Sequence, residues 1–153
     1  MDISEVETMM TEAIGRHGWW VQSVLPDANY PSFSYTVGLT ETFRHPEILM
    51  MGHHPKLMHD LLNDIGALIK GGARFSDWDT SDKVISGFPV FFRSVPGKEA
   101  SRWSLAAYKR YPEFELLQVF LPDAKGRFPW DPACDRETAK FQGALLEAMP
   151  KRT

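Results

Sequence analysis

The sequence predicts a single α+β domain with a mainly antiparallel sheet. The chain has 153 residues, 43% of them hydrophobic, and a chain of this length can bury roughly two-thirds of its unfolded surface around one core. Strand-like segments follow one another closely, without the regular strand and helix alternation of a doubly wound parallel sheet. We therefore expect residues 1–153 to form one domain, with about four helices packed around a sheet that could curl into an open or split barrel.

Four segments carry the apolar spacing of helices. The first, residues 4–17, opens with a capping box that starts at Ser4. Residues 55–70 give the clearest pattern, with a proline at the first helical position and two glycines after the last. Two further helices are predicted at residues 98–110 and after Asp135, which can cap its helix.

Six segments are predicted as strands, because they are rich in β-branched and aromatic residues and are bounded by turn residues. They are residues 19–25, 33–39, 47–51, 83–85, 88–95 and 114–121. The connection at residues 40–46 is short and polar. Residues 128–132 contain two prolines, so they should cross the surface as an irregular aromatic arm.

Charge and cysteine content exclude several classes of function. A net charge of −3 and an isoelectric point near 5.9 provide no broad cationic surface, so no nucleic-acid partner is expected. Cys134 is the single cysteine, which rules out an internal disulfide. No apolar run reaches membrane-spanning length, so neither a membrane partner nor a secretory route is expected. We expect a cytoplasmic protein.

The candidate ligand-binding residues are polar side chains and one glycine around a predicted strand, its following loop and a later strand. They are Tyr35, Thr36, Gly38, Arg44, His45, Glu47 and Gln118. The glycine could let a ring or a phosphate approach the backbone closely, or it could mark a bulge. The amide of Gln118 interrupts an apolar run, so it could anchor a buried network or line a pocket.

His45 has two interpretations. It could act as a general base near neutral pH. The stronger interpretation is structural: the following proline fixes a turn, and the histidine binds backbone groups. If the predicted strands at residues 33–39 and 47–51 pair antiparallel, the connection that contains His45 lies at the opposite end of the pair from His53 and His54. This separation, and spacings that match no zinc pattern, argue against a metal site.

No known catalytic motif occurs in the chain. Whether the protein is an enzyme therefore stays open, and the sequence designates no catalytic residue. Two hypotheses remain. One is a ligand-binding or cofactor-binding domain that takes a small molecule. The other is a non-catalytic interaction module that forms a homodimer or binds a partner protein, with a surface that includes Trp78, Trp103 and Trp130.

Five blocks of the sequence resemble the domain-of-unknown-function family 4262, in the family's order over about residues 15–146. They are GWWV at 18–21, PSFSYTVGL at 31–39, FRHPE at 43–47, LQVFLPD at 117–123 and GRFPW at 126–130. The resemblance implies a small bacterial cytosolic protein and brings no activity, cofactor or catalytic residue. The chain departs from the pattern at Arg44, where glycine is usual, and at Gly143, where proline is usual.

Residues 19–72 also resemble, more faintly, the flavin-reductase-like split barrels. In those proteins a similar strand is followed by a loop, an apolar strand and a helix. This likeness makes flavin a candidate cofactor, by analogy of fold alone.

Overall fold

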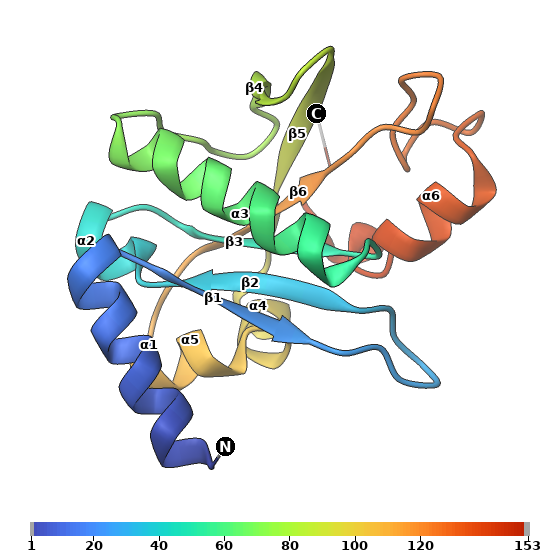
Figure 1. Cartoon of the computed structure of the whole chain (residues 1–153). Helices are drawn as coiled ribbons and strands as arrows, with labels where there is room; N and C mark the ends of the chain where they lie inside the picture. The colour runs from blue at the N-terminus through green and yellow to red at the C-terminus, as the bar shows by residue number, and fades with distance from the viewer. Residues whose placement is uncertain (1, 152–153) are drawn as a thin grey trace.

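The computed structural model describes residues 2–151, which form a six-stranded sheet covered by helices (Figure 1). The strands lie in the order β1-β2-β3-β6-β5-β4. Their bounds are Trp20–Val24 for β1, Phe33–Val37 for β2, Glu47–Met51 for β3, Thr80–Ile85 for β4, Phe88–Val95 for β5 and Leu116–Phe120 for β6. Neighbouring strands are antiparallel except β3 and β6, which are parallel. The predicted α+β class and mainly antiparallel sheet are confirmed.

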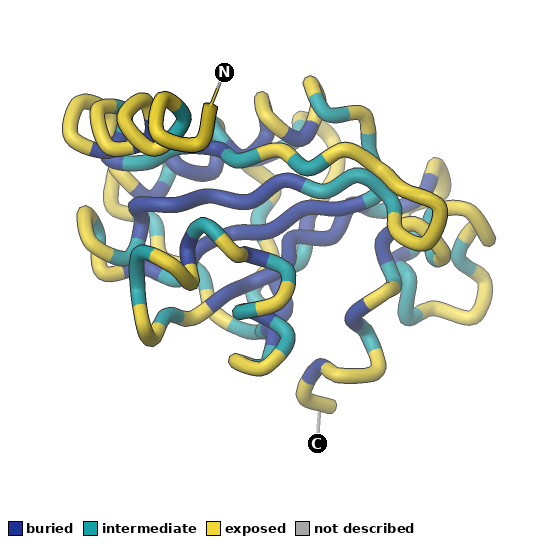
Figure 2. The backbone as a smooth tube through the Cα atoms, turned by 90° about the horizontal axis from the view of Figure 1, so that it is seen from below, coloured by how far each residue is buried: buried dark blue, intermediate teal, exposed yellow. Residues whose placement is uncertain are grey.

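The sheet is open, and β1 and β4 are its two edges. Its central strands are β3 and β6, in which every residue is buried. Each has four apolar residues and one polar residue, which is the composition of strands covered on both faces. Figure 2 shows this buried centre and the exposed loops around it.

Helices cover both faces of the sheet. α3 lies across one face, and α1, α4 and α5 lie on the other (Figure 1). The helices are α1 (Ile3–His17), α2 (Leu39–Phe43), α3 (Pro55–Lys70), α4 (Gly97–Trp103), α5 (Leu105–Arg110) and α6 (Arg136–Gln142), followed by a 3-10 turn at Leu146–Ala148. Alternate residues of β3 enter the two cores: Ile48 packs in the α3 layer, whereas Leu49 packs in the opposite layer.

The first helix begins earlier than predicted. α1 starts at Ile3, and Asp2 is its N-cap, since an Asp2 carboxylate oxygen accepts from the Glu5 N–H at 2.8 Å. The predicted capping box at Ser4 was wrong: Ser4 lies inside the helix, where its carbonyl accepts from the Thr8 hydroxyl. An aspartate with extended backbone takes the cap position instead.

Two other predicted segments differ in the structure. The predicted helix at residues 98–110 is two short helices, because Ser104 leaves the helical conformation at φ −122° and ψ 61°. The connection at residues 40–46 contains α2, a helix of five residues. A single turn of this length carries no periodic signal, and contacts from elsewhere in the chain hold it.

The last helix is shorter than predicted. α6 ends at Gln142, and Gly143, a poor helix former, follows it. Leu145 and Met149 are buried as expected, but they reach the core from the irregular segment and the 3-10 turn. A Cβ at Gly143 would lie 2.4 Å from the Ala139 carbonyl oxygen, so the backbone here leaves no room for the proline that is usual at this position.

The proline-rich segment at residues 128–132 covers the sheet rather than only crossing the surface. Phe128 is buried, and Trp130 packs edge-on against Phe91 and Phe120, with ring centroids 5.5 and 5.3 Å apart. The prolines prevent regular structure, but the apolar area of these rings places them in the core.

Candidate functional site

The most polar cluster of the interior surrounds the carboxylate of Glu47, at the start of β3. This side chain is fully buried. Its Oε1 accepts from the Thr36 hydroxyl at 2.8 Å and from the Leu39 N–H at 3.2 Å. Its Oε2 accepts from the Gly38 N–H at 3.3 Å and from the Thr40 N–H and hydroxyl at 2.9 and 2.6 Å. The carboxylate thus receives five hydrogen bonds and fixes the beginning of α2.

The electrostatics of Glu47 combine two opposed effects. Burial removes the carboxylate from water and raises its pKa, and the hydrogen bonds from Thr40, Thr36 and Leu39 act in the opposite direction. The donors fill the places around the carboxylate, so the cluster is a closed structural unit of the chain.

Gly38 permits a close approach, and the approaching group is the chain's own backbone. Its φ of 120° lies outside the range that other residues adopt easily. A Cβ on Gly38 would lie 2.7 Å from the Gly18 carbonyl oxygen and 2.8 Å from the Trp19 Cα. The glycine therefore joins the α1 to β1 corner to the start of α2.

His45 is 2% exposed, and both ring nitrogens are hydrogen-bonded to backbone. Nε2 accepts from the Phe75 N–H at 2.9 Å, so the proton of the neutral ring is on Nδ1, which donates to the Pro46 carbonyl at 2.8 Å. Burial lowers the pKa of His45. The ring connects the start of β3 to the segment before β4.

Acidification is expected to weaken the fold through His45. A folded pKa below the unfolded value means that the unfolded chain binds the proton more readily, so stability falls as pH drops below about 6.5. A proton on Nε2 would also face the Phe75 N–H. We expect the free energy of unfolding, measured with urea between about pH 7.5 and 5.5, to fall more steeply with decreasing pH in wild type than in His45→Gln. The difference between the two slopes should be up to about 1.4 kcal/mol per pH unit.

The exposed His59 provides a matched variant, His59→Gln, to be measured over the same pH range. Equal slopes for wild type and His45→Gln would show that His45 is not the titrating group.

Arg44 is exposed and ends α2 in the left-handed conformation, with φ 53° and ψ 47°. Glycine adopts this conformation without the Cβ penalty, so the glycine that the family resemblance leads us to expect here would fit the observed backbone. The Arg44 carbonyl accepts from the guanidinium of Arg74. The position thus has a structural role in ending the helix.

Gln118 belongs to a row of residues that crosses the sheet. Strand registers place Gln22, Tyr35, Leu49, Gln118 and Arg93 side by side on successive strands. The Gln118 amide donates to the Gln142 carbonyl at 2.9 Å. Its oxygen is buried and has no hydrogen-bond partner within residues 2–151. Gln118 therefore connects the end of α6 to the sheet, as a network anchor.

Sequence reasoning missed Arg93, which is 4% exposed. Its Nε donates to an Asp77 carboxylate oxygen at 3.1 Å, and its guanidinium carbon lies 3.6 Å from the centroid of a Trp78 ring. A terminal nitrogen donates to the Pro150 carbonyl. The available signal was a charged residue within a mostly apolar strand. A buried arginine needs such partners.

Tyr35 lines a groove with a volume of about 510 Å³. The groove lies between α1 and α5, over β1 and β2, and is lined mainly by apolar side chains. The lining residues are Asp2, Ile3, Val6, Glu7, Met10, Thr11, Gln22, Val24, Tyr35, Leu105, Ala106, Lys109 and Arg110. The Tyr35 hydroxyl accepts from the Ala106 N–H at 2.9 Å, and burial raises the pKa of Tyr35. The phenol is therefore protonated near neutral pH.

The groove carries charge on both walls. Arg110 is engaged by Glu41 through an ion pair and by the Thr11 hydroxyl. Glu7 on α1 and Lys109 on α5 are exposed, and neither forms an ion pair within residues 2–151. The groove thus has apolar lining, with the acids Asp2 and Glu7 on the α1 side and the unpaired base Lys109 on the α5 side.

The candidate residues named from the sequence do not line one pocket. Thr36, Gly38 and Glu47 meet in the closed cluster, and His45 and Arg44 lie at the far end of α2. Tyr35 lines the groove, and Gln118 lies further along the row, between Leu49 and Arg93. Ligand binding by this set stays a prediction, with Tyr35 as its member at the groove.

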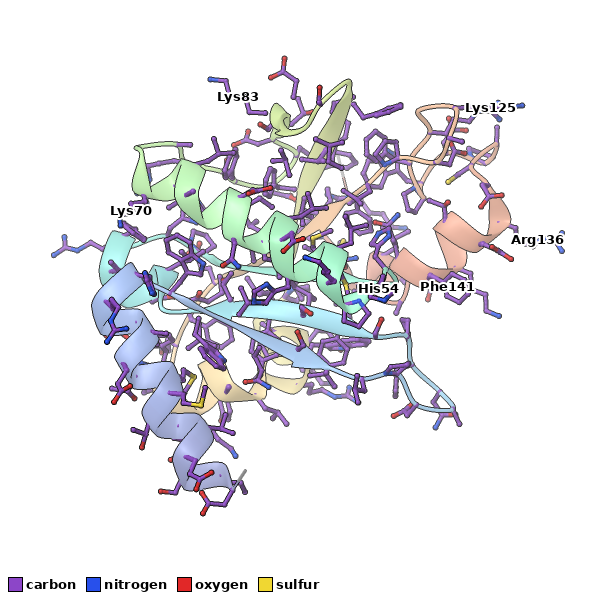
Figure 3. The ribbon with its side chains drawn as sticks, in the orientation of Figure 1. His54, Lys70, Lys83, Lys125, Arg136 and Phe141 are labelled. Carbon is purple, nitrogen blue, oxygen red and sulfur yellow. The ribbon has the colours of Figure 1, made fainter. Side chains whose placement is uncertain are left out.

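The histidines at the two ends of β3 are separated, as predicted, because β2 and β3 pair antiparallel and His45 and His53 lie on either side of β3. The C-terminal end of β3 lies beside α3 and α6. Figure 3 labels His54 at the start of α3 and Phe141 in α6. Within residues 2–151, no three His, Cys, Asp or Glu side chains are grouped as metal ligands.

Comparison with known proteins gives one family. No curated protein and no solved structure matches the chain, so the likeness to flavin-reductase-like split barrels has no support. In the part of the chain that the structure describes, no helix has the length and apolar character needed to cross a bilayer. A family model described as "Domain of unknown function (DUF4262)" matches residues 13–135. The chain therefore belongs to this family.

Proposed function

We propose that the protein binds a small molecule in the groove between α1 and α5. The observation that carries this proposal is the groove itself: about 510 Å³ in volume, with apolar lining and the Tyr35 hydroxyl. Ligand sites are typically concave and mostly apolar, with a few polar groups that orient the ligand. The Glu47 cluster is a poorer candidate, because its polar groups satisfy one another.

The test is native mass spectrometry of gently purified protein. We expect an added mass on the wild type. It should disappear in Val6→Trp, because Val6 lines the groove and a larger ring would fill it. The control Leu57→Trp alters an exposed leucine of α3 outside the groove lining, and it should retain the added mass. A bare wild-type chain, or equal retention by both variants, would count against the proposal.

A second candidate function is an interaction surface on the same side of the molecule. Six large apolar residues of α1, α5 and the loop between β1 and β2 are exposed: Ile3, Met9, Leu25, Tyr30, Leu105 and Tyr108. Where exposed apolar side chains are contiguous, they often form a binding surface for another protein. Trp78, Trp103 and Trp130 are partly buried and contact other aromatic rings of the chain. Sedimentation velocity of wild type and Tyr108→Glu tests self-association at this surface.

A further inference from the structure

We propose that the ligand of this groove is zwitterionic: a short apolar peptide with free ends, or an amino-acid derivative of the same kind. The inference rests on the proposed function and names the chemical class of its ligand. Its basis is the placement of opposite charges on the two walls, with apolar lining between them.

The acidic wall is the beginning of α1, where Glu7 lines the groove. Its carboxylate is exposed and has no ion-pair partner within the described residues, so it is available to a ligand ammonium group. Asp2, which also lines the groove, adds negative charge on this side, although one of its oxygens caps the helix.

The basic wall is the end of α5. Lys109 and Arg110 both line the groove, but Arg110 is neutralised by its ion pair with Glu41. Lys109 therefore supplies the cation that can receive a ligand carboxylate. An ammonium head on a flexible stem can follow such a group without a fixed geometry.

The space between the walls favours an apolar body. Val6, Met10 and Leu105 are among its lining residues. Tyr35 uses its oxygen as acceptor for the Ala106 N–H, and its own proton makes no hydrogen bond within residues 2–151. The phenol can therefore donate to a ligand carbonyl, such as that of a peptide bond.

A ligand with one charge fits this lining less well. A simple fatty acid would satisfy Lys109 but would leave the acidic wall unpaired, and a simple amine would leave Lys109 unpaired. Charge complementarity of this kind gives specificity more than affinity. Because both charged groups are exposed, each contact should contribute only about a twofold to fivefold change in Kd.

The experiment is calorimetric titration of four forms of trileucine: the free peptide, its N-acetyl form, its C-terminal amide, and the form blocked at both ends. In wild type, each single block should weaken binding by about twofold to fivefold. N-acetylation of the peptide should not change its Kd for the Glu7→Gln variant, and C-terminal amidation should not change its Kd for the Lys109→Gln variant. Glu12→Gln and Lys98→Gln are matched surface controls outside the groove and should behave as wild type.

The outcomes separate this inference from the proposed function. If the doubly blocked peptide binds wild type as tightly as the free one, and Val6→Trp abolishes both, the groove binds ligands but the zwitterionic class is wrong. If none of the four peptides binds, the inference is also overturned, whatever the native mass spectra show. Melting temperatures equal to that of wild type would confirm that the charge variants are folded.

Discussion

Glu47→Gln is expected to lower the free energy of unfolding by about 3–5 kcal/mol. All five hydrogen bonds at this side chain are received, from Thr36, Gly38, Leu39 and Thr40. The glutamine amide would direct N–H groups at two or more of these donors, and buried donors without acceptors are costly. Urea unfolding at constant pH measures the loss.

The matched control is Glu115→Gln, an exposed glutamate next to β6, which should change the free energy by less than about 0.5 kcal/mol. If Glu47→Gln cost no more than this control, the carboxylate would not be the group that holds α2 in place.

Gly38→Ala is expected to destabilise the fold by about 3 kcal/mol. The left-handed backbone costs roughly 1–2 kcal/mol for a residue with a Cβ. The added carbon would also lie 2.7 Å from the Gly18 carbonyl oxygen and 2.8 Å from the Trp19 Cα, an overpacking that costs about 1–3 kcal/mol. Both neighbours are backbone atoms, so no side-chain rotation relieves the contact. The shift of the urea midpoint measures the effect.

Gly15→Ala provides the opposite control. Gly15 lies within α1, where a Cβ would meet no heavy atom within 4 Å apart from its chain neighbours and the helix's own backbone, so alanine should stabilise the helix by about 0.5–1 kcal/mol. If the two alanine variants moved the midpoint in the same direction, the account of Gly38 would be wrong.

Local patterns predicted the elements whose signals are contained within them. Residues 55–70 carry both their apolar spacing and their end signals, and α3 matches them from Pro55 to Lys70. α2 was missed because its five residues depend on Glu47, which lies beyond the helix in the chain. The parallel pairing of β3 and β6 joins strands that are separated by α3, the β4–β5 hairpin, α4 and α5, so no local pattern contains it.

The candidate site was predictable only in part, for the same reason. The sequence marked Thr36, Gly38 and Glu47 as an unusual polar group, but not that they satisfy one another. The groove depends on the approach of α1 to α5, where Thr11 meets Arg110, 99 residues later. Such long-range proximity is a property of the folded chain, and Tyr35 was the one predicted residue that it includes.

The central claim is that ligands bind between α1 and α5 and not at the Glu47 cluster. Titration of isotope-labelled protein with free trileucine, followed by amide chemical shifts in NMR spectra, tests it most directly. The account predicts the largest shifts at Val6, Ala106 and Lys109, with the amides of Gly38 and Thr40 nearly unmoved. Largest shifts at Gly38 and Thr40, with α1 and α5 unaffected, would contradict it.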